Sequence, residues 1–458
     1  MNPSIFREYD IRGVVGEDLD AGSVYKIAQG FASYCSRKGV RRLSLGRDVR
    51  LSSPEFRDAV VRGLLTSGID VVDVGQVPTP LLYFSIVELE TDGGVMITGS
   101  HNPPEYNGFK LCVGTNAIYG DMIQEVRTIV ENETFIQGEG TLRHEVVIPL
   151  YEKKIRENVS LERSVRAVVD CGNGTGGLVA PKLFRELGVD VIPLFEEPDG
   201  NFPNHFPDPT VPENLQKLIE KVRETGAEVG VAYDGDADRI GVVDETGKVI
   251  FGDYLLVIFS RELLGRKPGA TIISEVKASQ NLYDDIEKHG GKPLMYKTGH
   301  SLIKKKMKEV GAELAGEMSG HIFFKDRYYG FDDAIYASAR LFEIMSRGDA
   351  PLSSLLSGLP EVVSTPEIRR DCPDEAKFEV VEEVKKALSR VAREVVTIDG
   401  VRALFDGGWG LVRASNTQPA LVLRFEGRSE EEVEKIRATV DEAVRGAMEA
   451  MEARKVGD

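Results

Sequence analysis

The sequence predicts an α/β protein made of repeated strand–helix units, followed by a smaller α+β unit at the C-terminal end. Three observations support this fold class. Short apolar runs alternate with amphipathic stretches as far as residue 360, and polar or glycine-rich loops follow many of these runs. Beyond that point, several strand-like runs precede one long helix. With 458 residues, the chain is too long for one hydrophobic core and suits about three or four domains.

The first unit is predicted over residues 1–150. Residues 22–38 are expected to form an amphipathic helix that Gly39 can end, with an apolar face made of Val24, Ile27, Ala28, Phe31 and Cys35. Apolar runs at residues 43–45, 71–74 and 95–97 predict strands. Residues 140–160 are charged and weakly periodic, so we expect the junction with the next unit there.

Two further alternating units are predicted over residues 151–254 and 255–360. In the second unit we expect strands at 165–169, 229–233, 240–243 and 249–251, and a helix at 178–187. In the third unit we expect strands near 271–275, 293–297 and 312–315, and helices near 280–288 and 301–309. The proline-rich segment 198–212 predicts an extended loop.

The last unit, over residues 361–458, is predicted to be the smaller α+β domain. Its expected strands lie near residues 395–398, 410–412 and 420–425. Ser429 and Glu432 have the spacing of a capping box for the final helix. The buried stripe of that helix is expected to consist of Val433, Ile436, Val440, Val444, Met448 and Met451.

The composition excludes several classes of protein. The formal net charge of −17 argues against a nucleic-acid or membrane-surface role, because both favour a basic face. No apolar run approaches the roughly 18 residues that a membrane span needs, and Arg7, Glu8 and Asp10 interrupt any signal-peptide core. The four cysteines are widely spaced, which indicates neither a disulfide framework nor a zinc site. We therefore expect a reduced, cytoplasmic enzyme with no nucleic-acid or membrane partner.

The loop Thr98–Tyr106 follows an apolar strand and presents a single hydroxyl, that of Ser100. Pro103 and Pro104 have no N–H and keep the loop out of regular structure. Gly99 allows the backbone to approach a ligand closely. Ser100 is therefore a candidate nucleophile or phosphate carrier, although an ordinary strand-to-loop turn uses similar residue types.

Three carboxylates stand at alternate positions of one tight loop, those of Asp234, Asp236 and Asp238. Clustered carboxylates repel one another unless a cation neutralises them, and Mg²⁺ is the usual ion beside phosphate. An EF-hand is excluded because its sixth position, which requires glycine, is Arg239. A phosphatase-like aspartyl nucleophile remains an alternative interpretation of the same loop.

The turn Gly172–Gly177 matches the pattern G-x-G-x-x-G between a predicted strand and a predicted helix. A dinucleotide site is one interpretation of this pattern. A lone match is a weak signal, because glycine-rich turns also serve packing alone, and we favour the packing role.

Two further loops carry polar groups that suit sugars and phosphates. Gly316–His321 offers a carboxylate, a hydroxyl and an imidazole, and such groups can both donate to and accept from sugar hydroxyls. Arg413–Pro419 offers a guanidinium, two hydroxyls and an amide, which match a phosphate dianion. Basic groups at other loop ends are Lys110, Lys277, Lys297 and His300.

Taken in this order, the motifs resemble those of the α-D-phosphohexomutase family, and most closely its phosphomannomutase/phosphoglucomutase branch. The resemblance covers nearly the whole chain. Its segments are Glu8–Gly13, Thr98–Lys110, Asp199–Pro203, Asp234–Arg239, Lys297–His300, Gly316–His321 and Arg413–Pro419.

The resemblance implies three related α/β domains and a smaller C-terminal domain around a central cleft. It implies that Ser100 carries a phosphoryl group and that Mg²⁺, one ion per chain, is bound by Ser100, Asp234, Asp236 and Asp238. The sugar hydroxyls would be held by Glu317 and Ser319, and the non-reacting phosphate by Arg413, Ser415, Asn416 and Thr417. The transferred phosphoryl group would be surrounded by Lys110, Arg239, His300 and His321, with Tyr9, Arg12 and Lys277 nearby.

The reaction implied by the resemblance is reversible phosphoryl transfer between C1 and C6 of hexose phosphates, either mannose or glucose or both. Phosphoserine and a bisphosphorylated hexose, which serves as intermediate and activator, would carry the group in a monomer or homodimer. The alternatives are a phosphoglucosamine mutase, a sugar-phosphate phosphatase that uses an aspartate of the 234–238 loop, and a non-catalytic sugar-phosphate sensor.

Overall fold

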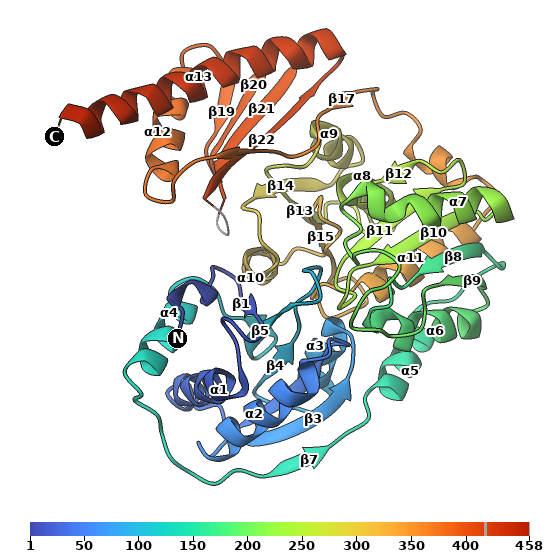
Figure 1. The fold of residues 1–458 in the computed structure, drawn as a ribbon. Helices are drawn as coiled ribbons and strands as arrows, with labels where there is room; N and C mark the ends of the chain where they lie inside the picture. The colour runs from blue at the N-terminus through green and yellow to red at the C-terminus, as the bar shows by residue number, and fades with distance from the viewer. Residues whose placement is uncertain (416–418, 458) are drawn as a thin grey trace.

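The structure is a computed structural model that describes residues 1–415 and 419–457, with side chains described as far as residue 451. Four units follow one another along the chain, and each is built on one sheet (Figure 1). The N-terminal unit, in blue, and the C-terminal unit, in orange and red, lie at opposite ends of the view. Each sheet falls within one of the four predicted residue ranges. The limits of those ranges stay a prediction.

The first unit contains a mixed sheet with the strand order β1-β5-β4-β2-β3-β7, and β6 pairs with β5. Its strands are β1 Ile11–Val14, β2 Arg42–Arg47, β3 Asp70–Gln76, β4 Gly93–Ile97, β5 Tyr106–Val113, β6 Asn116–Ala117 and β7 Leu142–His144. Its helices are α1 Ala21–Ser36, α2 Ser53–Leu65, α3 Thr79–Glu88 and α4 Asp121–Glu131. The Asp20 carboxylate and the Ser23 side chain form a reciprocal capping box that starts α1. Helix α5, Ile148–Asn158, occupies the predicted junction.

The second and third units contain smaller mixed sheets. The second has β8 Arg166–Asp170, β9 Asp190–Leu194, β10 Val229–Tyr233, β11 Ile240–Asp244 and β12 Val249–Ile250, with α6 Ala180–Leu187 and α7 Gln216–Thr225. The third has β13 Thr271–Glu275, β14 Lys292–Tyr296, β15 Leu314–Gly316 and β16 Ile322–Phe324, with α8 Gly252–Arg266, α9 Gln280–Lys288, α10 His300–Val310 and α11 Ala334–Ser346.

The three sheets share one topology, which confirms the prediction of related α/β units. The corresponding strand orders are β3-β2-β4-β5, β9-β8-β10-β11 and β14-β13-β15-β16. In each, the first three strands are parallel and the last pairs antiparallel with its neighbour. Each unit therefore ends in a hairpin at the carboxyl end of a parallel strand, where α/β sheets place ligands.

The fourth unit is an antiparallel sheet with helices α12, Lys377–Leu388, and α13, Glu430–Gly457, which confirms the predicted α+β domain (Figure 1). Its strands are β17 Val363–Ser364, β18 Ile368–Asp371, β19 Glu394–Val396, β20 Val401–Phe405, β21 Gly408–Ala414 and β22 Ala420–Gly427. Only half of the predicted capping box forms, because the Glu432 N–H donates to Ser429 Oγ while Glu432 Oε2 has no hydrogen-bond partner. In the predicted stripe of α13, Met448 is only partly buried.

The hydrophobic core joins the first three units more closely than the fourth. One cluster of buried side chains extends from α3 through β10 to α8 and α11. The fourth unit has its own core. It contacts the third unit through a small cluster that contains Val276, Trp409 and Leu411, and through buried Arg402 and Arg424, which donate to carbonyl oxygens of residues 276–278. Among the described residues, no helix is long and apolar enough to cross a membrane.

Candidate active site

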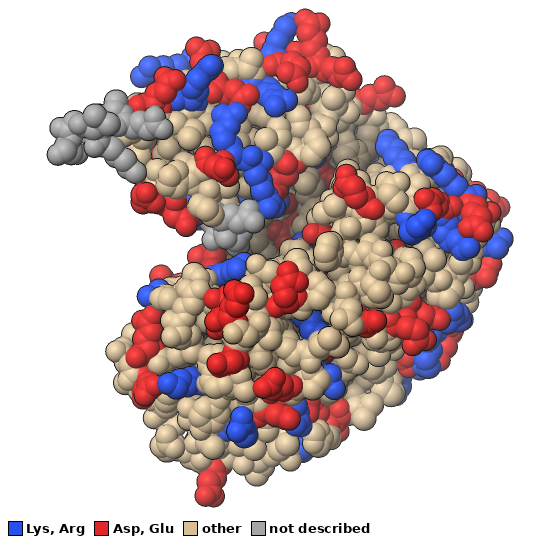
Figure 2. Space-filling model, viewed as in Figure 1, with Lys and Arg blue, Asp and Glu red and all other residues tan. Residues whose placement is uncertain are grey.

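Four loops that the sequence singled out each connect the two strands of a hairpin, and the first three of them lie in equivalent places of the three related units. The loops at Ser100, Asp234–Asp238, Glu317–His321 and Arg413 join β4 to β5, β10 to β11, β15 to β16 and β21 to β22. The hollow between the first and fourth units is visible in the space-filling view (Figure 2). The repeated topology therefore brings residues that are far apart in the sequence to one cleft.

Ser100 meets the aspartate loop directly. Its Oγ donates to Asp234 Oδ2 over 2.8 Å, and the Ser100 side chain is buried. Ser100 has φ 48° and Ala237 has φ 54°, so both loops hold a non-glycine residue in the left-handed region. Such strained backbone persists only where its surroundings hold it, and it is typical of functional sites.

Arg50, which the sequence analysis missed, holds the Ser100 loop in place. Its Nη1 donates to the carbonyl oxygens of Pro103 and Tyr106, and its Nη2 donates to those of Ser100 and Asn102, over 2.5–3.0 Å. Its Nε donates to Asp48 Oδ2, which also accepts the Gly99 N–H. Arg50 is 1% exposed, so this buried guanidinium holds the backbone of the loop in one conformation.

The three predicted metal ligands lie together. Oxygen atoms of Asp234, Asp236 and Asp238 are all within 4.8 Å of one another, and the three residues are fully buried. Lys110 Nζ is 2.7 Å from Asp236 Oδ2 and also contacts Asp238 Oδ2. One lysine cannot balance three carboxylates, and Asp236 Oδ1 has no hydrogen-bond partner although it is buried. Buried uncompensated charge is costly, so the cluster fits a divalent cation.

Burial and the neighbouring charges determine which groups of this cluster are ionised. Burial and the two neighbouring aspartates raise the pKa of Asp234. Burial alone would lower the pKa of Lys110, but the attraction of Asp236, Asp238 and Asp234 raises it. Lys110 is therefore a cation in the metal-free protein, and its charge partly offsets that of the neighbouring carboxylates.

Two stacked histidines lie next to the aspartates and have opposite charge preferences. The rings of His300 and His321 are 5.3 Å apart. Burial lowers the pKa of His300, in spite of Asp332, whose Oδ2 is 3.4 Å from its Nδ1. Burial would also lower the pKa of His321, but Asp238 and Glu317 raise it to about 9. The pair thus places one neutral imidazole beside one imidazolium.

The predicted sugar loop is organised around His321. Glu317 Oε2 lies 3.1 Å from His321 Nδ1, and Glu317 Oε1 accepts the Gly299 N–H over 2.8 Å. Ser319 Oγ is also 3.1 Å from His321 Nδ1. Glu275, which the sequence analysis missed, accepts from the Thr298 hydroxyl and from the Met318 N–H, so it ties the two neighbouring loops together.

The predicted phosphate residues line a separate cavity of about 140 Å³ between the third and fourth units. Its lining consists of Tyr9, Lys277, Thr298, Glu367, Arg369, Arg413, Ser415 and Val422. Lys277 Nζ is 3.2 Å from Glu367 Oε2, and Arg413 Nε donates to Asp399 Oδ2. The two other residues predicted for this site, Asn416 and Thr417, are outside the described residues.

The remaining predicted residues, Arg12, Tyr9 and Arg239, each contact a different loop of the site. Arg12 Nη1 donates to Asn102 Oδ1 over 2.6 Å, and Arg12 Nη2 is 2.5 Å from Asp10 Oδ2. The Tyr9 hydroxyl donates to the Thr298 carbonyl. Arg239 Nε lies 3.4 Å from His321 Nε2, which places its guanidinium between the second and third units.

The glycine-rich turn at 172–177 has a packing role, as predicted. The Thr175 N–H donates to the Gly235 carbonyl over 3.0 Å. A Cβ on Gly174 would lie 2.7 Å from the same oxygen, and one on Gly177 would lie 1.9 Å from the Glu196 carbonyl oxygen. The turn is therefore pressed against the aspartate loop and supports it.

Comparison with known proteins matches all four units. The models described as phosphoglucomutase/phosphomannomutase alpha/beta/alpha domains I, II and III match residues 3–137, 149–247 and 251–363. The model of the C-terminal domain of the same family matches residues 367–443.

Individual relatives match over almost their full length. The phosphomannomutase/phosphoglucomutase of Pseudomonas aeruginosa is 49% identical over 434 residues, which are 95% of this chain and 94% of that protein. The phosphoglucomutase of Neisseria gonorrhoeae is 48% identical, with 94% and 95% covered. The crystal structure of a phosphoglucomutase/phosphomannomutase family protein from Burkholderia thailandensis superposes with a TM-score of 0.93 at 46% identity and covers 98% of both chains.

Proposed function

Because the chain belongs to the phosphoglucomutase/phosphomannomutase family, we propose that it moves a phosphoryl group reversibly between C1 and C6 of hexose phosphates. Glucose and mannose phosphates are the proposed substrates. The observation that carries this proposal is the contact of Ser100 Oγ with Asp234 at 2.8 Å, inside a buried cluster of three aspartates and Lys110. A loop hydroxyl beside acids that fit a divalent cation suits a phosphoryl carrier.

In the proposed reaction, the phosphoryl group of phosphoserine 100 passes to the free hydroxyl of a hexose phosphate. The P–O bond to Ser100 breaks, a P–O bond to the sugar forms, and a basic group takes the proton of the sugar hydroxyl. The bisphosphate then turns over in the cleft and returns its other phosphoryl group to Ser100. The serine is thus phosphorylated again at the end of each cycle.

Ser100, Asp234, Asp236 and Asp238 are the proposed ligands of one Mg²⁺ ion. The bound ion would offset the negative charge of the transferred group. Three basic side chains add positive charge at the same place. Lys110 contacts Asp236, His321 contacts Asp238, and Arg239 lies 3.4 Å from His321. His300 brings a neutral imidazole to the proton transfer.

The distal phosphate is proposed to bind in the cavity lined by Lys277, Arg413 and Ser415, together with Asn416 and Thr417 of the same loop. This site has to accept either end of the sugar, so it should recognise phosphate and ignore ring position. Tyr9 lines this cavity and Arg12 contacts the Ser100 loop through Asn102, so the two side chains are proposed to guide the turning intermediate from one site to the other.

Glu317 and Ser319 are proposed to hold the 3- and 4-hydroxyls of the ring. Turning the sugar end for end exchanges the places of these two hydroxyls, so one pair of groups serves both orientations. Glucose and mannose share both hydroxyls and differ at C2, which this pair has no need to contact. Because the fourth unit has a core of its own, it is proposed to move as one body and to close over the sugar, which would exclude water.

The test is a paired assay of sugar-phosphate isomerisation and of phosphate release. Conversion of glucose 1-phosphate and mannose 1-phosphate to the 6-phosphates, with little inorganic phosphate, is the expected result. Release of phosphate as the main product would favour a phosphatase. Binding without conversion would favour a sensor, and a preference for glucosamine phosphate would move the protein to that branch.

A further inference from the structure

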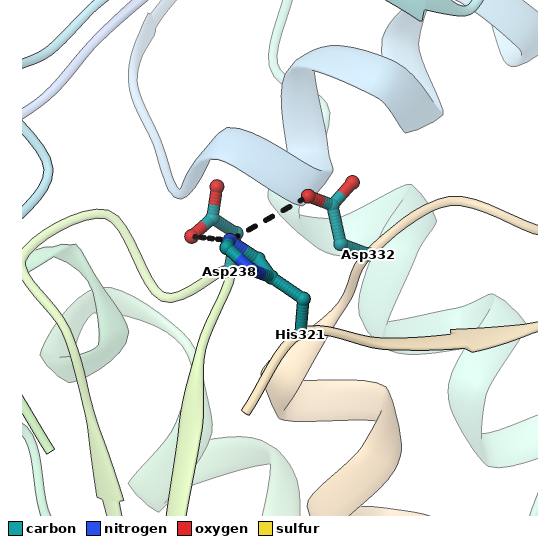
Figure 3. Close-up of side chains that lie close together, drawn as sticks. All are labelled: Asp238, His321 and Asp332. Carbon is teal, nitrogen blue, oxygen red and sulfur yellow. Dashed lines mark ion pairs between the residues drawn. The ribbon is translucent and has the colours of Figure 1, made fainter. Parts of the chain in front are cut away.

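A second cluster of possible metal ligands lies beside the three aspartates. His321 Nε2 is 3.2 Å from Asp238 Oδ1 and 4.0 Å from Asp332 Oδ2 (Figure 3). The three residues come from the β10–β11 loop, from the end of the β15–β16 loop and from the segment before α11. Their side chains are at most 6% exposed, and one ligand atom of each lies within 4.8 Å of the others.

Each of these three side chains has one anchored atom and one atom that faces the shared space. His321 Nδ1 is 3.1 Å from Glu317 Oε2, which orients Nε2 toward the two carboxylates and toward Arg239 Nε, 3.4 Å away. Asp332 Oδ1 accepts from Lys304 Nζ over 2.8 Å, whereas its buried Oδ2 makes no hydrogen bond and lies 3.4 Å from His300 Nδ1. Asp238 Oδ2 contacts Lys110, and its Oδ1 faces His321. A carboxylate that orients the far nitrogen of a histidine is the usual outer support of a metal-binding imidazole.

We propose that Asp238, His321 and Asp332 bind a transition-metal ion of the Zn²⁺ class, at a site distinct from the three-aspartate site. An imidazole with two carboxylates suits Zn²⁺, whereas Mg²⁺ prefers oxygen ligands only. Metal–ligand bonds of about 2.0–2.2 Å put tetrahedral ligand atoms about 3.3–3.6 Å apart. The observed separations of 3.2 and 4.0 Å lie on either side of that range.

The donor set leaves the fourth coordination position open for a water molecule or a phosphate oxygen. Binding would require His321 Nε2 to be free of a proton, so any proton held there would be released to solvent, and Arg239 Nε would give up its contact with that nitrogen. Asp238 would then serve both sites, with one oxygen facing each. On the basis of the proposed function, occupancy withdraws His321 from the transferred phosphoryl group, so this ion would inhibit turnover without displacing Mg²⁺.

The experiment measures Zn²⁺ binding by calorimetry to the full-length protein saturated with Mg²⁺, without sugar. We expect one Zn²⁺ per chain under these conditions. Asp332→Asn should weaken Zn²⁺ binding at least tenfold and retain Mg²⁺ binding, which also serves as a check of its folding. Asp234→Asn should show the reverse. Asp333→Asn is the matched control at a neighbouring buried carboxylate that is outside the cluster, and its Zn²⁺ affinity should be unchanged.

X-ray absorption at the zinc edge supplies the second readout, and we expect scattering from an imidazole ligand. The proposal is overturned if Mg²⁺ displaces all of the Zn²⁺, or if Asp234→Asn abolishes Zn²⁺ binding while Asp332→Asn leaves it unchanged. Because these measurements use no sugar, their outcome is separate from the paired assay of the proposed function.

Discussion

Replacement of Arg50 by lysine should loosen the Ser100 loop while leaving the sheet beneath it in place. The guanidinium uses all of its donor directions, with four bonds to carbonyl oxygens of residues 100–106 and one to Asp48. A lysine ammonium keeps the charge but has only three N–H donors. At least two of the five hydrogen bonds are therefore lost.

The loss of loop stability can be estimated from the buried hydrogen bonds that Arg50 makes. A hydrogen bond to a charged group is worth about 1.5–3 kcal/mol, so the loss of two bonds should cost the loop about 3 kcal/mol or more. A change of this size makes local opening about a hundredfold more frequent. Ser100, with its strained φ of 48°, would lose its fixed position, and we expect kcat to fall at least tenfold.

Hydrogen exchange followed by mass spectrometry tests this expectation on the peptide that contains residues 98–106. Exchange should speed up there by about two orders of magnitude, and it should stay unchanged at the turn after α7, where Ala227 N–H donates to Val222. Arg42→Lys, on the exposed start of β2, is the matched control. Wild-type exchange and turnover in Arg50→Lys would refute the reasoning.

Three further predictions concern other parts of the molecule. Gly174→Ala should weaken Mg²⁺ binding, because the added Cβ would lie 2.7 Å from the Gly235 carbonyl oxygen and displace the aspartate loop. Calorimetry measures this affinity, and an unchanged value would contradict the supporting role of the turn. Burial would raise the pKa of Glu262, but hydrogen bonds from Arg266 and Arg347 lower it to about 2, below its ordinary value of 4.5. The contribution of the ionised Glu262 carboxylate to the free energy of unfolding is therefore present above pH 4.5 and is lost as the pH falls toward 2. The melting-temperature advantage of wild type over Glu262→Gln should shrink over that interval, and an advantage that is constant with pH would contradict the shift. Galactose 1-phosphate, inverted at C4, should be a far poorer substrate than the glucose and mannose phosphates in steady-state kinetics, and comparable kcat/KM would rule out the Glu317–Ser319 hydroxyl pair.

The sequence was most informative where a motif is contiguous. Asp234, Asp236 and Asp238 are brought together by one short loop, so their spacing alone indicated a cation site. The strand–helix alternation likewise predicted the fold class, and strands β10 and β13 and helix α9 have the predicted bounds. Local patterns of this kind need no knowledge of the tertiary fold.

Part of what the sequence did not indicate depends on burial from several sides or on distant partners, although the amphipathic helices α4 and α7 were also missed. Helices α3 and α8 are buried over most of their surface, so they lack the polar face that makes a helical period visible. Arg50 and Asp332 belong to no conspicuous motif, and their roles arise from carbonyl oxygens and histidines that the fold brings to them. The shared hairpin topology of the first three units was also invisible locally, because the strand order depends on pairing between distant segments.

The central claim is that Ser100 carries the phosphoryl group that moves between the two ends of the sugar. The most direct measurement labels the phosphoenzyme with radioactive phosphate, locates the label by peptide mapping, and then adds unlabelled glucose 1-phosphate. We predict that the label lies on Ser100, that Ser100→Ala takes up none while keeping its fold, and that the sugar removes it as hexose bisphosphate and hexose phosphate. Label on another residue, or its release only as inorganic phosphate, would contradict the account.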